Sequence, residues 1–306
     1  MKYIPLRIAA ACLAPLLVLN PGHAHAQPAD PACVTPAPVV RMPHISIETR
    51  GSASNPTIIL IPGLSSPSSV WDGVWPELAK THRVVLVQVN GFAGDDPGDN
   101  LKPGVLDGIV ADLDSYIAKN KLQGAAVIGH SMGGLVGLML AKAHPADLGK
   151  LMIVDSLPWF GMLFGPTATV AAVEPQAKAM RDQMAATYGK PDAASAERTA
   201  KTLALKPESQ AAVAGWVMKA DARVSAQAMY EDITTDLRGD LKDIATPITL
   251  LYPSSAGLPA AMADPFYKGA YAAAPHVTYV RIDDSAHFIM LDQPEAFAKA
   301  VAAFAR

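Results

Sequence analysis

The segment Gly129-His130-Ser131-Met132-Gly133 has the residue types of a nucleophile turn. The apolar run from Ala125 to Ile128 before it predicts a strand, and apolar residues from Met132 to about Ala143 predict a helix. Small residues on such a turn let the backbone close, and the serine side chain is forced outward. We therefore expect Ser131 to attack a carbonyl carbon as a catalytic nucleophile. The alternative is a turn in which Ser131 only caps the helix.

A serine hydroxyl is a weak nucleophile at neutral pH and needs a base within hydrogen-bonding reach. His287 follows the last predicted strand and precedes the last predicted helix. Loops that follow parallel strands gather at one edge of a sheet, so His287 is expected near Ser131. The other histidines after residue 42 precede strands, end a helix or lie within the turn: His44, His82, His130, His144 and His276. His287 is therefore the predicted general base, and the alternative is an ordinary surface histidine.

Attack on a carbonyl group produces an oxyanion, which needs two preorganised hydrogen-bond donors. The backbone N–H of Met132 lies at a predicted helix N-terminus, where the helix dipole also favours negative charge. The second donor is expected from Leu64, in the loop after the predicted strand Thr57 to Ile61. Pro62-Gly63 would let that backbone come close. The predicted oxyanion hole is therefore Leu64 and Met132, and the alternative is a plain connecting loop.

These residues need a scaffold, and the chain alternates short apolar runs with helical patterns. This alternation predicts an α/β fold with a mostly parallel sheet covered by helices on both faces. The strands Ile45 to Thr49 and Thr57 to Ile61 are separated by a turn cluster, so we expect them to pair as a hairpin at a sheet edge. The other predicted strands are Arg83 to Val89, Ala125 to Ile128, Leu151 to Val154, Ile248 to Tyr252 and Val277 to Ile282.

The strand signal disappears between Ser156 and about Asp243, where the chain is rich in alanine and methionine. This stretch predicts several helices, which form an insertion in the alternating pattern. Its first part, Leu157 to Phe164, is too apolar for a simple solvent-exposed loop. We expect Trp159 there, and Phe288 beside the predicted base, to contact an apolar substrate group of small to medium size. The alternative role for such residues is packing between the insertion and the core.

At 306 residues, the chain is long enough for one large α/β domain with an insertion or for two modest domains. Because 50% of the residues are hydrophobic and only 17% are charged, it can bury a sizeable core, and disorder is not expected over most of its length. The net charge of −3 gives no support for nucleic-acid binding. Residues 1–26 have the features of a signal peptide: Lys2 and Arg7, an apolar run too short for a membrane span, and the cleavage site Ala24-His25-Ala26. We therefore expect an exported protein, either periplasmic or secreted.

Cleavage after Ala26 would leave Cys33 as the one cysteine, within a proline-rich leader that we predict to be flexible over residues 27–42. An intramolecular disulfide is then impossible. A cysteine nucleophile and a metal site of His and Cys residues are also not expected, and no cofactor is predicted. Stability must come from the apolar core.

Four segments resemble motifs of the α/β-hydrolase superfamily: IPGL at 61–64, VNGFAG at 89–94, GHSMGG at 129–134 and SAHFIMLDQPEAF at 285–297. The resemblance covers the chain from Ile45 to Phe304. It implies one hydrolase domain over residues 43–306, with a sheet of the eight-stranded type and a helical cap at about 156–243. Pro62 replaces the histidine that usually precedes the glycine, which leaves backbone donation from the loop intact.

The resemblance also implies a catalytic acid. The family commonly places it just after the seventh strand, but the matching segment Tyr252 to Gly257 contains no acidic residue. Some members take the acid from the end of the sixth strand, which here is Asp155. This carboxylate would hold the His287 imidazole in the required tautomer. Asp264, on a longer loop, is the alternative, and a third possibility is that neither residue serves.

A serine at this turn, in place of the aspartate of related dehalogenases and epoxide hydrolases, implies acyl transfer to water. The resemblance favours a carboxylesterase-like serine hydrolase that acts on a small-molecule ester. Hydrolysis of a lactone, an amide or a C–C bond beside a carbonyl would use the same residues. A cofactor-free haloperoxidase-like side activity has no particular support, and a non-catalytic ligand-binding protein is the alternative from a different class.

Overall fold

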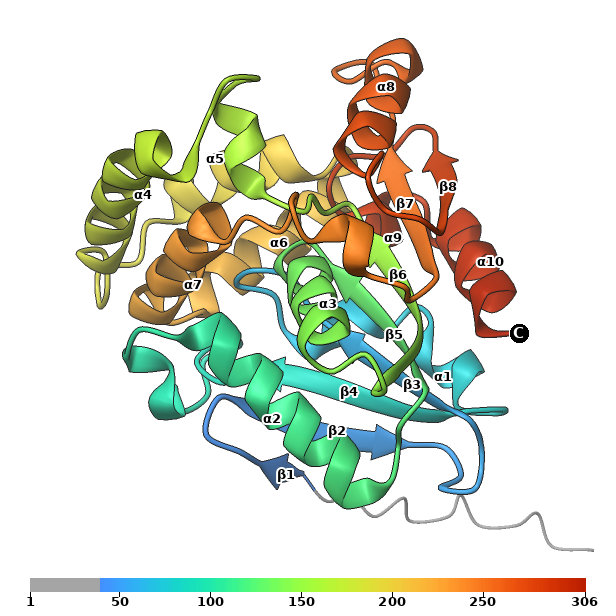
Figure 1. Ribbon diagram of the computed structural model, residues 1–306. Coiled ribbons are helices and arrows are strands. Elements are labelled where there is room, and N and C mark those ends of the chain that lie inside the picture. The colour runs from blue at the N-terminus through green and yellow to red at the C-terminus, as the bar shows by residue number, and fades with distance from the viewer. Residues whose placement is uncertain (1–38) are drawn as a thin grey trace, which may run out of the picture. The chain divides into compact units, whose positions relative to one another are not determined.

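The computed structural model describes residues 39–306 (Figure 1). The predicted signal peptide and residues 27–38 of the predicted leader lie outside the described residues. At the end of that leader, Val40 and Arg41 form a short strand, β1, and pair antiparallel with the next strand. Two residues of the predicted leader therefore belong to the sheet. From residue 39 onward, none of the helices combines the length and the apolar character needed to cross a bilayer.

One sheet of eight strands forms the centre of this unit, in the order β1-β2-β4-β3-β5-β6-β7-β8. The pairs β1–β2 and β2–β4 are antiparallel, and all pairs from β4 to β8 are parallel. The mostly parallel sheet that the alternation predicts is confirmed. The strands are β1 (Val40–Arg41), β2 (Ile45–Arg50), β3 (Thr57–Ile61), β4 (Arg83–Val89), β5 (Ala125–His130), β6 (Leu148–Val154), β7 (Ile248–Pro253) and β8 (Val277–Ile282).

The predicted hairpin between β2 and β3 is wrong. β4 lies between them and pairs with both, antiparallel to β2 and parallel to β3. Its sequence RVVLVQV is buried on both faces along most of its length. A strand of this kind fits the interior of a sheet and not its edge. The turn after β2 leads into β3, which is the next strand along the chain but does not pair with β2. Local sequence patterns do not reveal this difference.

Helices cover both faces of the sheet (Figure 1). On one face, α2, α3 and α8 bury their apolar sides in a core with β2, β3 and β5. On the other face, α1 and α10 form a second core, in which Trp71 stacks on Phe297 with 6.2 Å between ring centroids. These helices and the short α9 are α1 (Trp75–Leu78), α2 (Val105–Asn120), α3 (Met132–Ala143), α8 (Ala260–Ala270), α9 (Ile289–Asp292) and α10 (Pro294–Ala305).

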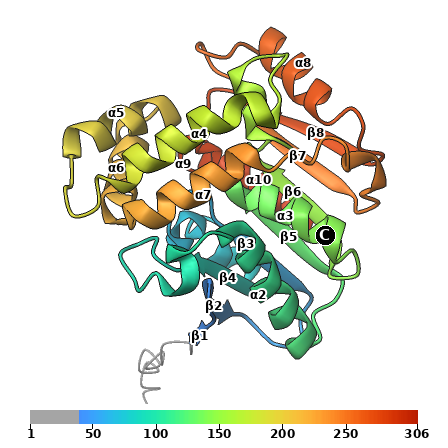
Figure 2. The ribbon, with the colours of Figure 1, turned by 60° about the vertical axis from the view of Figure 1, so that its left-hand side comes forward.

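Four helices are inserted between β6 and β7 and gather beyond one end of the sheet (Figure 2). They are α4 (Val170–Ala185), α5 (Ala193–Leu203), α6 (Pro207–Lys219) and α7 (Ala222–Thr234), with α4 packed on α7 and α5 on α6. Side-chain oxygens of Thr169, Asp192 and Asp221 accept backbone N–H groups in the first turns of α4, α5 and α7. Such N-caps start helices. The predicted fold class, with its helical insertion, is confirmed.

Candidate active site

Ser131 lies on the turn between β5 and α3, with φ of 53° and ψ of −123°. Few residues other than glycine adopt this backbone conformation. The Ser131 N–H donates to the carbonyl oxygen of Val154 at 3.0 Å, which anchors the turn to β6. A Cβ atom on Gly133 would lie 2.4 Å from the carbonyl oxygen of Ile61, so only glycine allows α3 to approach β3 this closely. The turn places Ser131 on the wall of a cavity.

His287 and Asp155 contact each other although 132 residues separate them. Asp155 directly follows β6, His287 lies in the loop after β8, and His287 Nδ1 is 2.7 Å from Asp155 Oδ2. A carboxylate only accepts, so Nδ1 carries the proton and Nε2 is left to accept one. His287 lines the same cavity as Ser131. Among the hydrogen bonds of residues 39–306, none joins Ser131 to His287. Hydrogen bonds between catalytic residues often tighten only when substrate is bound.

Asp155 has a second partner, which the sequence did not reveal. The hydroxyl of Tyr267 on α8 donates to Asp155 Oδ1, and the Asp155 N–H donates to the carbonyl oxygen of Leu251 at 2.8 Å. Burial, and then the charge of Asp155, raise the pKa of Tyr267 above its ordinary value, so the phenol stays neutral and donates. Because both carboxylate oxygens are bonded, Asp155 is held in one orientation toward His287.

Asp264, the alternative acid, has different partners. It lies on α8, where it accepts a hydrogen bond from the Tyr252 hydroxyl at 2.9 Å and from Arg281 Nη1 at 3.0 Å. The hydrogen bond from Arg281, and then that from Tyr252, lower the pKa of Asp264. Among the contacts of residues 39–306, none joins Asp264 to His287. The structure therefore brings Asp155, and not Asp264, to the imidazole.

His130 holds the loop that carries His287, a role that the sequence did not suggest. His130 Nε2 donates to the carbonyl oxygen of His287 at 3.0 Å, and the two ring centroids are 4.6 Å apart. Burial, and then the charge of His287, lower the pKa of His130 well below its ordinary value, so the ring stays neutral. A Cβ atom on Gly63 would lie 2.7 Å from His130 Nδ1, which explains the glycine of the IPGL segment.

The two predicted oxyanion donors come from segments on either side of Ser131. Met132 begins α3, and the first N–H groups of a helix have no partner within it. Leu64 lines the cavity, and its loop runs so close to the serine that a Cβ atom on Gly63 would lie 3.1 Å from Ser131 Cβ. The next residue, Ser65, donates from its hydroxyl to Ser225 Oγ on α7 at 2.8 Å. This bond ties the Leu64 loop to the helical insertion.

Asp292 fastens the His287 loop to the same insertion. Its carboxylate is fully buried and accepts the backbone N–H groups of Ala286 and Leu205, each at 3.0 Å. The N–H of Phe288 donates to the carbonyl oxygen of Leu203 at 3.1 Å. Asp292 lies within the motif at 285–297, but its role could not be predicted from the sequence, because its partner Leu205 lies 87 residues away in the insertion.

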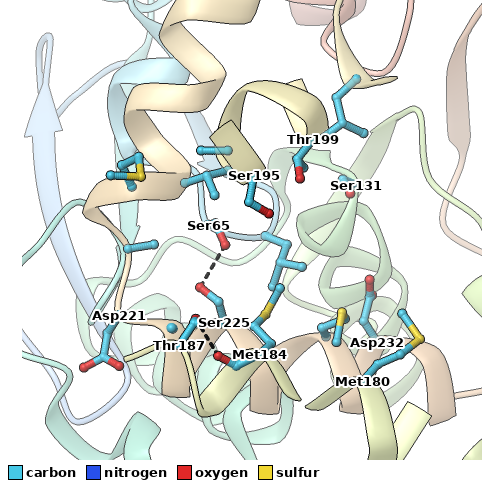
Figure 3. Close-up of a pocket in the computed structure, with 18 of the residues that line it drawn as sticks. Ser65, Ser131, Met180, Met184, Thr187, Ser195, Thr199, Asp221, Ser225 and Asp232 are labelled. Atoms are coloured by element: carbon cyan, nitrogen blue, oxygen red, sulfur yellow. Dashed lines mark hydrogen bonds between the residues drawn. The ribbon is translucent and has the colours of Figure 1, made fainter. Parts of the chain in front are cut away.

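A cavity of about 1290 Å³ lies between the insertion and the sheet, and Ser131, His287 and Asp155 all line it. Ser131 is among the lining residues labelled in Figure 3. The apolar residues that the insertion contributes include Phe160, Leu163, Phe164, Met180, Met184 and Met229. Phe288 also lines the cavity. Trp159 does not: it is fully buried between α4 and α7, and its indole N–H donates to the carbonyl oxygen of Ile233 at 2.7 Å. Its place in the structure is the core of the insertion.

A profile described as "Alpha/beta hydrolase family" matches residues 58–300, which include Ser131, Asp155 and His287. The chain belongs to the alpha/beta hydrolase family. The resemblance of its four motifs to that family is thereby confirmed.

Similar proteins include several hydrolases. The pimeloyl-[acyl-carrier protein] methyl ester esterase of Aeromonas hydrophila is 33% identical over 116 residues, which are 38% of this chain and 43% of that enzyme. The match therefore spans less than half of that relative. An esterase from Thermogutta terrifontis has a TM-score of 0.71 and 20% identity, over 88% of this chain and 98% of that one. An enol-lactonase from Burkholderia xenovorans has a TM-score of 0.68 and 18% identity, over 85% of this chain and 95% of that one. Identities this low show a shared fold.

One further group in this alpha/beta hydrolase has the ligand types of a cation site. Among residues 39–306, Asp114, His144 and Asp147 each offer an atom within 4.8 Å of the others. Burial, and then the charge of Asp114, raise the pKa of Asp147. His144 lies at the far end of α3 from Ser131, and a helix of that length spans about 18 Å. This group is therefore separate from the cavity.

Proposed function

We propose that this chain is a serine hydrolase that cleaves a carboxylic ester with an apolar group of small to medium size. The observation that carries the proposal is the hydrogen bond from His287 to Asp155, at a cavity that Ser131 also lines. A histidine in this tautomer can take a proton at Nε2 while the carboxylate stabilises the imidazolium that forms.

In the proposed reaction, His287 Nε2 takes the proton of Ser131 Oγ as Oγ bonds to the carbonyl carbon. The C=O electron pair moves to oxygen, and the backbone N–H groups of Leu64 and Met132 donate to the oxyanion. When the C=O bond re-forms, the alcohol oxygen leaves with the proton from His287, and an acyl-serine is left. His287 then deprotonates a water molecule, which attacks the acyl carbon. The same steps release the acid and return the proton to Ser131.

Support for an apolar substrate comes from the wall of the cavity. Phenylalanine, leucine and methionine side chains of the insertion line it, together with Phe288. Methionine side chains are flexible and adapt to irregular ligands. The acyl or alcohol group of the ester would bury its carbon surface there, at a gain of about 0.8 kcal/mol for each CH₂ group.

We also propose that the protein is exported to the periplasm or secreted. Support comes from the sequence of residues 1–26 alone: two basic residues, a short apolar run and the small residues before Gln27.

The proposal is tested by measuring hydrolysis of acyl esters of increasing chain length, with lactones and an amide alongside. The native protein, Ser131→Ala and Ser195→Ala are compared. Ser195 is a serine on α5 that lines the same cavity, so its replacement controls for the loss of a hydroxyl group. We expect ester turnover that Ser131→Ala abolishes and Ser195→Ala preserves. Turnover that survives in Ser131→Ala would exclude the mechanism, and a native protein inactive on every compound would favour a binding role.

A further inference from the structure

Asp232 on α7 lines the same cavity, yet the proposed reaction does not use it. The residue is only 6% exposed, and its Oδ1 atom is enclosed without a hydrogen-bond partner. Throughout residues 39–306, no side chain or backbone group forms a hydrogen bond or an ion pair with this carboxyl group. Figure 3 shows Asp232 and Met180 on one wall of the cavity. The hydrogen-bonding capacity of this carboxyl group is therefore not met by any other described residue.

The surroundings of Asp232 favour its neutral form. The arginines on either side in the sequence are already paired, Arg223 with Asp221 at 2.6 Å and Arg238 with Asp236 at 2.7 Å. Burial raises the pKa of Asp232 well above its ordinary value, and no neighbouring charge opposes this effect. The protonated carboxyl group has one O–H donor and one carbonyl acceptor.

In the free protein no group of residues 39–306 satisfies this carboxyl group, so its hydrogen bonds must come from what the cavity holds. An apolar residue would need no such partner, and Met180, Met184 and Met229 already line the wall. A ligand that fills the cavity and bonds to the carboxyl would satisfy it, and a ligand of equal size that lacks such a group would leave it without a partner. A buried polar group of this kind discriminates strongly between such ligands.

We propose that Asp232 is a specificity-determining residue that hydrogen-bonds to a hydroxyl group of the substrate, on a part remote from the ester bond. A hydroxyl group suits a neutral carboxyl group, because it can either accept from an acid O–H or donate to an acid carbonyl, whichever the accessible Oδ2 atom presents. The inference rests on the proposed function, since it defines the substrate class of the same cavity: a hydroxylated ester.

The kinetic test uses esters of one alcohol with three kinds of acid: an unsubstituted alkanoate, the ω-hydroxyalkanoate and the ω-aminoalkanoate, each over a series of chain lengths. The quantity of interest is the ratio of kcat/KM for the hydroxylated ester to that for the unsubstituted ester of equal length. We expect Asp232→Leu to lower the highest ratio about tenfold, as for the loss of one hydrogen bond and its desolvation. Asp232→Asn should retain most of it, because an amide also donates and accepts. Gln183→Leu, a matched change at an exposed polar residue of the same cavity, should leave the ratio unchanged.

A binding test separates this inference from the proposed function. Calorimetric titration of Ser131→Ala with the same esters requires no hydrolysis, and circular dichroism shows whether each variant is folded. We expect tighter binding of the hydroxylated ester, and loss of that preference when Asp232→Leu is added. If the native protein hydrolyses no ester but this preference is found, the proposed reaction fails and the role of Asp232 stands. An equal ratio with and without Asp232→Leu, or a preference for the amino ester that depends on Asp232, would overturn the inference.

Discussion

Asp155→Asn removes one of two acceptor atoms on which the geometry around His287 depends. In the native protein, Asp155 Oδ2 accepts from His287 and Oδ1 accepts from the Tyr267 hydroxyl. An asparagine side chain has one acceptor oxygen and an NH₂ group that only donates. Two donors would therefore compete for one oxygen. The backbone should tolerate the change, since Asp155 has φ of 45° and asparagine adopts positive φ readily.

If the amide oxygen faces Tyr267, its NH₂ group faces His287 Nδ1, which must then accept. The imidazole proton moves to Nε2, the atom that should accept the proton of Ser131. The negative charge that stabilises the imidazolium is lost as well. Loss of the correct tautomer in a catalytic triad lowers kcat about 10⁴-fold, which corresponds to about 5 kcal/mol of transition-state stabilisation.

Adding Tyr267→Phe separates the tautomer from the charge. Without the phenolic hydroxyl, the amide oxygen is free to turn toward His287 and restore the proton to Nδ1. We therefore expect the double variant Asp155→Asn/Tyr267→Phe to recover at least about tenfold in kcat over Asp155→Asn alone, the effect of one hydrogen bond. Steady-state hydrolysis of a chromogenic ester measures both changes, with circular dichroism as a check on folding.

Asp264→Asn is the matched control, because its partners are Tyr252 and Arg281. We expect kcat to stay within about twofold of the native value, since the change lies on the partly exposed side of α8. If kcat of Asp155→Asn stays within about tenfold of native, or if Asp264→Asn loses as much, Asp155 is not the residue that orients His287.

Three further predictions concern the turn, the buried acid and export. Gly133→Ala should lower the free energy of unfolding by about 1–3 kcal/mol, because its Cβ would lie 2.4 Å from a backbone oxygen. The control Gly215→Ala, on α6 where a Cβ atom would meet nothing within 4 Å in the described part of the chain, should leave that free energy unchanged or raise it. Urea titration measures both values. In the unfolded chain Asp232 loses its proton above about pH 4, whereas in the folded protein its raised pKa keeps it protonated. The free energy of unfolding should therefore fall as pH rises from about 4, by up to about 1.4 kcal/mol per pH unit, until the pKa of the folded protein is reached. Asp232→Asn should remove this slope. Exported protein should begin at Gln27 by mass spectrometry, and a cytoplasmic protein that begins at Met1 would contradict export.

Local patterns in the sequence were sufficient to predict the scaffold and the turn. The strand–serine–helix segment around Ser131 depends on neighbours within a few residues, and the later parallel strands show as uninterrupted apolar runs. The partner of β2 could not be predicted in the same way, because β4 follows it more than thirty residues later. The order of strands in a sheet depends on which strands are apolar on both faces. The turn between β2 and β3 does not indicate that β4 lies between them.

The parts of the site that the sequence did not reveal are contacts between distant segments. Tyr267 reaches Asp155 from 112 residues away, and His130 supports a loop 157 residues further along the chain. Tyrosine and histidine in these places have no distinctive local pattern. The prediction that Trp159 contacts substrate is wrong. Its apolar segment is compatible with a cavity wall or with a core, and only the fold shows that the indole is enclosed within the insertion. The shape of the cavity follows from such long-range packing.

In the proposed reaction, Ser131 carries the acyl group between the two steps. The direct measurement is rapid mixing of the protein with an activated ester, acid quenching within one turnover, and peptide mapping by mass spectrometry. The expected result is one acyl group on the peptide that contains Ser131, and none in Ser131→Ala. Hydrolysis of the ester with no acylated peptide, or with the acyl group on another residue, would show that Ser131 is not the nucleophile.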